Sequence, residues 1–311
     1  MTIEAPLGRV ATYFARRTNR LGWVARGLLS QRDPSDTTLR EHLIAAVGGL
    51  VRPDGSARGT GAALPTITAL RELIELGAPE AVVGRPLAWV MALQGKPGAF
   101  SDGCTAARHP RRVCEHFLTG FFAPAPPTQR VAPMTVPNGK VYRAESHARF
   151  ALSCLALEAV VLAGRVHEVG IGRHLDSFEH LLGEWALWSD QLAPDLGFAA
   201  LGALAVAPER WGPTVDRLVG VVAVNQLPDG TWPRADFFNG LEALAKVRHA
   251  TAEPVLAKAL PALLQRQRED GSFGSVAQDE RALIALKVLL RLDGQRDRRT
   301  DGQRDRGTAG Q

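Results

Sequence analysis

The chain is poor in cysteine and has no long apolar run, and each absence excludes a class of protein. Three cysteines among 311 residues are too few for a disulfide framework, so reduced thiols, metal ligands or core packing are their candidate roles. No stretch reaches the roughly 20 consecutive apolar residues that a membrane-spanning helix needs. The first residues show neither an apolar signal core nor a small-residue cleavage site, so we expect a cytoplasmic protein.

Lysine is also scarce, and the positive charge of the chain comes from arginine. Only five of the 37 basic residues are lysine, and the formal net charge is +5. The arginines are spread along the chain and form no basic block interleaved with aromatic residues, which excludes nucleic acid as an expected partner. With 45% hydrophobic and 22% charged residues, the composition is that of an ordinary folded domain rather than a disordered chain.

What the sequence does contain is a recurring turn with a glycine, usually followed by an aromatic residue. The glycines of successive turns are 43, 41, 91 and 41 residues apart; they are Gly55, Gly98, Gly139, Gly230 and Gly271. The long interval is close to two steps, so we expect a degenerate unit between, over residues 178–207. About six units of roughly 40 to 45 residues follow, a period typical of helical-hairpin repeats.

Each unit is predicted to be a helix, a tight turn and a second helix. Apolar helical segments flank the last two turns, at residues 219–226 and 241–247 and at residues 260–268 and 281–292. No alternating strand pattern is evident, which favours an all-α repeat protein. We divide the chain into an N-terminal helical cap (1–38), a repeat domain (39–292) and a C-terminal tail (293–311). The tail has almost no apolar residues, so we expect it to be disordered. The proline-rich segment 123–137 is predicted to be a long loop of the kind that forms lids.

The last two turns carry a sequence motif that resembles a known family. The segments NQLPDGTW and RQREDGSF resemble the QW-type repeat of the terpenoid-cyclase and protein-prenyltransferase superfamily, and Gln94 in ALQGKPGAF matches it in part. The resemblance covers most of residues 39–292. It implies an α/α toroid of about six helical hairpins, with inner helices around an apolar central cavity.

Two further segments resemble the zinc site of protein prenyltransferase β subunits. The run Ser101-Asp102-Gly103-Cys104 is similar to the family's D-G-C run, and His147 opens the expected next inner helix. The resemblance therefore implies zinc held by Asp102, Cys104 and His147, and these ligand types leave an open fourth position on the metal. Two alternatives are a structural site built from the neighbouring Cys104, His109, Cys114 and His116, or no metal at all.

The same resemblance suggests which residues contact a substrate. Lys96 and Arg143 are candidate basic contacts, and Phe150, Phe237 and Phe238 open inner helices and are candidates to line the cavity. The aromatic residues that directly follow the turns are expected to pack between repeats. Magnesium would join the site if the substrate carries a diphosphate. Nothing in the sequence indicates a partner subunit.

We therefore expect a zinc-dependent enzyme that acts on a hydrophobic, isoprenoid-like small molecule by transfer or cyclisation. The proton-donor motif D-x-D-D of class II cyclases is absent, and the acids found are scattered; they include Asp190, Asp195, Asp279 and Glu280. One alternative is a metal-free, terpene-cyclase-like enzyme that uses another acid. The other is a non-catalytic toroid that binds a lipid or a partner protein around a structural zinc.

Overall fold

The computed structural model describes residues 3–59, 63–94, 130–168, 170–188 and 194–308, and the regular secondary structure of this part of the chain is almost entirely helical. Its strands are β1 (Met134–Thr135) and β2 (Val141–Tyr142), which pair antiparallel across the turn at Gly139. The all-α prediction is thus confirmed, apart from this short hairpin. Among the described residues, no helix combines the length and the apolarity that crossing a membrane requires.

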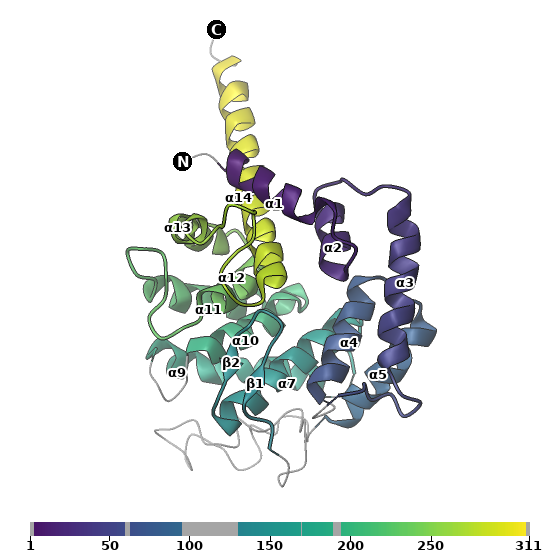
Figure 1. The fold of residues 1–311 in the computed structure, drawn as a ribbon. Coiled ribbons are helices and arrows are strands. Elements are labelled where there is room, and N and C mark those ends of the chain that lie inside the picture. The colour runs from purple at the N-terminus through teal and green to yellow at the C-terminus, as the bar shows by residue number, and fades with distance from the viewer. Residues whose placement is uncertain (1–2, 60–62, 95–129, 169, 189–193, 309–311) are drawn as a thin grey trace.

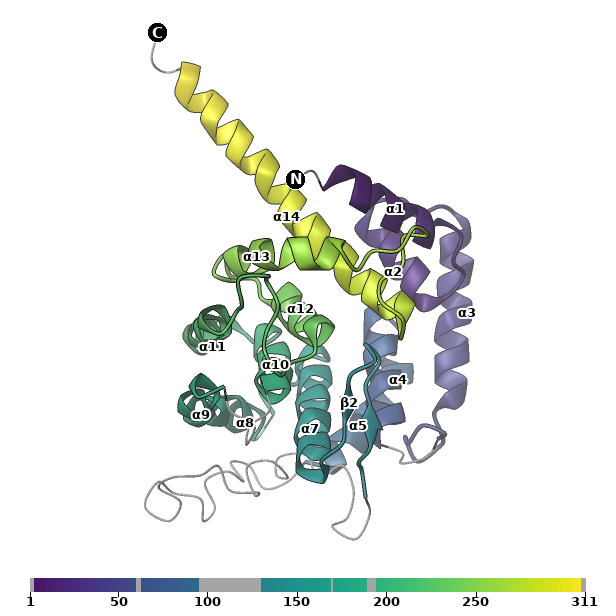
Figure 2. The same cartoon turned by 60° about the vertical axis from the view of Figure 1, so that its left-hand side comes forward.

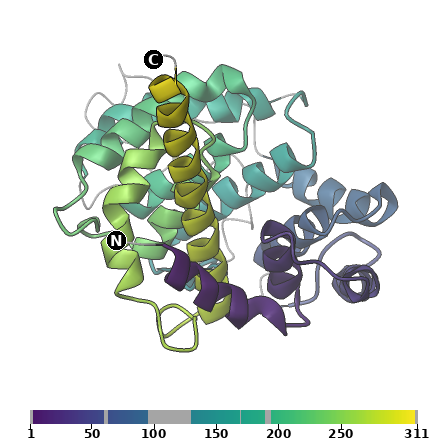
Figure 3. The ribbon, with the colours of Figure 1, turned by 90° about the horizontal axis from the view of Figure 1, so that it is seen from above.

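The helices form two layers around a common axis (Figures 1, 2 and 3). The inner layer consists of α2 (Arg20–Leu28), α4 (Ala63–Glu75), α7 (Glu145–Leu162), α10 (Pro194–Ala205), α12 (Phe237–Lys246) and α14 (Gln278–Thr308). The outer layer consists of α1 (Glu4–Ala15), α3 (Ser35–Leu50), α5 (Glu80–Ala92), α8 (Ile171–Ser177), η1 (Phe178–Leu181), α9 (Leu182–Ala186), η3 (Glu209–Trp211), α11 (Gly212–Val224) and α13 (Ala252–Leu264). Contacts run around the inner layer from α4 through α7, α10, α12 and α14 to α2. This is the arrangement of an α/α toroid.

The recurring turns share one backbone geometry. Gly55, Gly139, Gly230 and Gly271 have φ angles of 90°, 87°, 85° and 87°, in the left-handed region that glycine adopts without strain. In each turn the glycine amide donates to the carbonyl three residues earlier. The repeat inferred from the sequence is therefore a repeat in structure at these four positions, and Gly98 lies outside the described residues.

Three of these turns, at Gly55, Gly230 and Gly271, pack directly against an outer helix, which explains a second need for glycine. A Cβ atom on Gly230 would lie 2.2 Å from the Lys258 carbonyl oxygen in α13, and one on Gly271 would lie 2.3 Å from that of Arg9 in α1. Gln267 strengthens the second contact by donating to the Pro6 carbonyl oxygen at 2.9 Å. The last repeat thus docks on the first helix and closes the ring.

Both ends of the described chain are helical. The predicted N-terminal cap is a hairpin in which α1 takes an outer position and α2 an inner one, so it completes the ring instead of covering it. The predicted disordered tail from residue 293 is drawn as helix through Thr308 (Figure 2). No proline interrupts this segment, and the intrinsic helix propensities of arginine and glutamine permit its helical continuation.

Candidate active site

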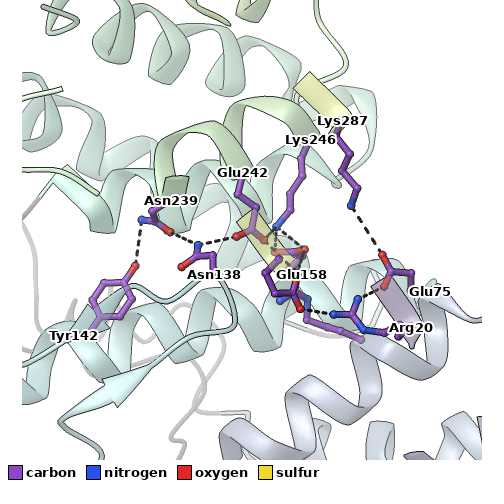
Figure 4. A network of polar contacts seen from close by, with 11 residues as sticks. Arg20, Glu75, Asn138, Tyr142, Glu158, Asn239, Glu242, Lys246 and Lys287 are labelled. Atoms are coloured by element: carbon purple, nitrogen blue, oxygen red, sulfur yellow. Dashed lines mark hydrogen bonds and ion pairs between the residues drawn. The ribbon is translucent and has the colours of Figure 1, made fainter. Parts of the chain in front are cut away.

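A cavity of about 310 Å³ lies at the centre of the ring, between the inner helices. One part of its wall is apolar and includes Ile74, Leu162, Val206, Ala245, Leu283 and Ile284. The rest is charged, with four cationic and five carboxylate side chains: Arg20, Arg71, Lys246 and Lys287, and Glu72, Glu75, Glu158, Glu242 and Glu280. Figure 4 labels six of them: Arg20, Lys246, Lys287, Glu75, Glu158 and Glu242. The expectation of an apolar cavity is therefore wrong for this region, because charged residues of α2, α4, α7, α12 and α14 line it.

A smaller hollow of about 40 Å³ adjoins the main cavity. The two share Arg71, Glu158, Glu242 and Lys246 as lining residues, and the small hollow adds mostly uncharged groups; these include Tyr142, Leu155, Phe198 and Asn239. Pro137 lines both hollows. The C-terminal end of the predicted proline-rich loop therefore forms part of the cavity wall.

Glu158 on α7 is the centre of one charge network. Its side chain is only 4% exposed, and it lies 3.0 Å from Arg71 Nη2 on α4 and 3.0 Å from Lys246 Nζ on α12. Lys246 also lies 3.0 Å from Glu242, whose other oxygen accepts from Asn138 Nδ2 at 2.8 Å. Burial raises the pKa of Glu242, but Lys246 and Arg71 outweigh that effect and lower it to about 2. Both carboxylates of this network are thus matched by cations.

Arg20 on α2 is the centre of a second network, in which one guanidinium meets three carboxylates. It lies 3.2 Å from Glu72 and makes closer ion pairs with Glu75 on the same helix α4 and with Glu280 on α14. Burial raises the pKa of Glu72 and of Glu280 in spite of the nearby Arg20. The side chain of Arg20 therefore joins α2, α4 and α14 where the ring has few direct helix contacts.

A third polar group ties together the N-terminal ends of α10 and α12. The Asp195 carboxylate is fully buried; it accepts from the Asp236 amide at 2.9 Å and from Asn239 Nδ2 at 3.1 Å, and it pairs with Lys140. Burial and the neighbouring Asp195 raise the pKa of Tyr142 well above its usual value. Because donors from three residues hold the Asp195 carboxylate in place, we assign it a structural role.

The structure describes only part of the zinc site that the sequence implies. Asp102, Cys104 and Lys96 lie outside the described residues, as do the alternative ligands His109, Cys114 and His116. His147 lies half-buried in the first turn of α7, where burial and Lys140 lower the pKa of its imidazole. A neutral imidazole is the form that binds a metal. Among the described residues, no three His, Cys, Asp or Glu side chains group as a metal site.

The predicted substrate contacts that the structure describes do not line the two cavities. Phe150 is buried and packs edge-on against Phe178 of the outer layer, with ring centroids 6.1 Å apart. Phe237 and Phe238 are buried in a chain of ring contacts that links Trp232 to Phe273. Within the described structure neither cavity is lined by these rings or by the exposed Arg143. These phenylalanines pack between repeats, a role that the sequence analysis had given to the other aromatic residues.

Comparison with known proteins identifies relatives in structure but none in sequence. No protein-family model matches the chain, and no curated protein matches it. A variant of the type II terpene cyclase MstE from Scytonema, in complex with geranylgeranyl dihydroxybenzoate, superposes with a TM-score of 0.56 and 12% identity over 93% of this chain and 97% of that one. A protein from Actinoplanes gives a TM-score of 0.57 and 13% identity over 93% and 98%.

This chain has the fold of a terpenoid cyclase. A further MstE variant, in complex with the product merosterolic acid A, matches over 93% of this chain and 96% of that one, with a TM-score of 0.53 and 14% identity. At identities of 12 to 14% the likeness concerns the fold alone. The toroid that the family resemblance implies is thereby confirmed.

Proposed function

We propose that the protein is a terpene-cyclase-like enzyme that rearranges a hydrophobic isoprenoid substrate in the central cavity. The observation that carries the proposal is the cavity itself, which lies inside the inner ring of a terpenoid-cyclase fold and has one apolar and one charged wall. Its volume is within the range of about 300 to 1,000 Å³ that small-molecule sites occupy. The apolar wall would hold the isoprenoid chain, which has no polar groups to desolvate.

The charged wall suits a reaction that passes through cations. Cyclisation of an isoprenoid moves positive charge along the chain, and preoriented carboxylates lower the free energy of that charge without further reorganisation. Glu158 and Glu242 are held by Arg71 and Lys246 in fixed positions along one side of the cavity. The three carboxylates that meet Arg20 outnumber its guanidinium and would supply the negative charge that stabilises a passing cation.

The substrate class comes from the structural neighbours and is tested by conversion. Purified protein is incubated with geranylgeranyl dihydroxybenzoate and, separately, with geranylgeranyl diphosphate, and products are separated by mass spectrometry. Cyclisation gives a new compound of unchanged mass. Val206→Trp, which fills the cavity, should abolish conversion, whereas Val224→Trp, at a position 87% exposed on α11, should not. Conversion of neither compound, or equal conversion by both variants, would contradict the proposal.

Zinc held by Asp102, Cys104 and His147 is a separate part of the proposal and is supported by the sequence resemblance and by the place of His147 in the first turn of α7. Metal content of chelator-washed protein measures it directly. We expect near-stoichiometric zinc that is lost in both Cys104→Ala and His147→Ala while the far-UV helical signal persists. Loss of zinc together with the fold would favour the structural alternative.

A further inference from the structure

The arrangement around Arg20 places more negative charge at the cavity wall than the surrounding cations balance. Glu72, Glu75 and Glu280 all make ion pairs with this one guanidinium. The next cation, Lys287, lies 3.9 Å from Glu75 and has a side chain that is 39% exposed. Three carboxylates that share one close cation repel one another, and such repulsion favours retention of a proton.

The other cations of the cavity are already committed to different partners. Arg71 and Lys246 lie within 3.0 Å of Glu158, and Lys246 is equally close to Glu242. Counted over the whole lining, four cations face five carboxylates, so one carboxyl group has no cation of its own. The geometry locates that surplus at Arg20, where the carboxylates outnumber the guanidinium by three to one.

Two of the three carboxyl groups are better placed than the third to hold a proton. Burial raises the pKa of both Glu72 and Glu280, and the charge of Glu75 adds to the effect at each. For Glu280, the charge of Glu242 across the cavity adds further, while Arg20 and Arg71 act in the opposite direction. The two groups come from different helices, α4 and α14, and both line the main cavity.

We propose that the carboxyl cluster around Arg20 retains one proton, distributed between Glu72 and Glu280, and that this carboxyl pair is the acid that starts the reaction in the cavity. The assignment rests on the proposed function. In the first step the carboxyl O–H bond breaks, and the π electrons of a substrate double bond form a new C–H bond. A carboxylate and a carbocation remain. After ring closure, loss of a proton from the carbon next to the cation forms a double bond and restores the carboxyl group.

Arg20 is a positioning residue in this scheme. Its guanidinium bridges both members of the pair, so it holds them at the wall and stabilises the carboxylate that forms when the proton leaves. The atoms balance over the whole cycle, because the proton taken from the carboxyl pair is replaced by one from the substrate. The product is therefore an isomer of the substrate, and no co-reactant is needed.

The retained proton can be measured on the protein alone. Side-chain carboxyl carbons are labelled with ¹³C-glutamate, and their chemical shifts are followed by NMR from pH 3 to pH 9. We expect the resonances of Glu72 and Glu280 to titrate together and above the usual glutamate range of about 4.3. Glu72→Gln and Glu280→Gln should each remove one resonance and shift the other, whereas Glu179→Gln, on the outer surface, should change neither. Titration of both groups in the ordinary range would overturn the assignment.

Conversion assays separate failure of this inference from failure of the proposed function. With a convertible isoprenoid, we expect Glu72→Gln and Glu280→Gln to slow turnover by about 100-fold or more, the usual contribution of a general acid. Unchanged turnover in the double variant would overturn the acid assignment and leave the cyclase function standing. A raised titration without conversion of any isoprenoid would instead contradict the cyclase function.

Discussion

The two sides of the inner ring are held together by different forces. On one side, α7, α10 and α12 pack closely through small residues: a Cβ on Gly240 of α12 would lie 2.9 Å from the Phe198 ring of α10. On the other side, α2, α4 and α14 are joined by the ion pairs of Arg20 (Figure 4). Long charged side chains span a wider separation than alanine and glycine allow.

This difference explains where the cavity lies. Small residues let helix backbones approach and leave no hollow, so the α7–α10–α12 side encloses only the small one of about 40 Å³. The main cavity of about 310 Å³ extends to the side where charged side chains separate the helices. The charged residues thus line the wide part of the cavity, whereas the other side of the ring is held by close packing of small residues.

The charge network at Glu158 gives the largest expected effect on stability. Glu158→Ala would leave Arg71 and Lys246 facing each other with only Glu242 between them, so we expect a loss of about 3–5 kcal/mol in the free energy of unfolding. Chemical denaturation measures it. Glu168→Ala, which removes an exposed ion pair with Arg165, should cost less than about 1 kcal/mol. Equal costs would show that the inner network does not hold the ring.

The packed side is tested with a pair of glycines in neighbouring repeats. Gly240→Ala places a methyl group 2.9 Å from the Phe198 ring, and overpacking of this kind costs about 1–3 kcal/mol. Gly220→Ala, on the exposed face of α11 with no atom within 4 Å, should instead stabilise the protein by up to about 1 kcal/mol. If Gly240→Ala also stabilised the protein, α10 and α12 would not pack as closely as the structure shows.

The smallest expected effect is a dependence of stability on pH that is opposite in sign for the two networks. The pKa of Glu242 is lowered to about 2, so its contribution is present above the usual glutamate range and is lost as pH falls toward 2. The pKa values of Glu72 and Glu280 are raised, so their contribution is complete below that range and is lost as pH rises through the raised values.

Unfolding measured at a series of pH values separates these two contributions. Glu280→Gln, which mimics the protonated carboxyl group, should reduce the loss of stability on the alkaline side of the glutamate range. Glu242→Gln should reduce the loss on the acid side. A Glu280→Gln variant whose stability follows the same pH curve as the parent would contradict retention of a proton near Arg20.

Much of the fold could be predicted from the sequence, because the glycine turns repeat at a regular interval. Their spacing indicates helical hairpins, and their left-handed φ angles explain why glycine recurs. The role of α2 was harder to predict, since Trp23 and Val24 give the apolar stripe expected of any amphipathic helix, inner or capping. Only the contacts of α2 with α14 place it in the ring.

The candidate site could be predicted far less well than the fold. The cavity is lined by charged residues from five different helices, and no short motif connects Arg20, Glu72 and Glu280 in the sequence. Glu280 stood out only as one scattered acid. One signal in the sequence could have indicated the cavity. It is a charged residue within the apolar run of a predicted inner helix, such as Glu158 in α7.

The central claim, that the cavity protonates and cyclises an isoprenoid, is tested most directly by conversion in deuterated water. Geranylgeranyl dihydroxybenzoate is incubated with the protein in D₂O, and the product is analysed by mass spectrometry. Because the exchangeable acid adds one deuteron and the final step removes one proton from carbon, the account predicts a cyclised product one mass unit heavier than the substrate. A cyclised product without deuterium, or the same product from the Glu72→Gln/Glu280→Gln double variant, would contradict it.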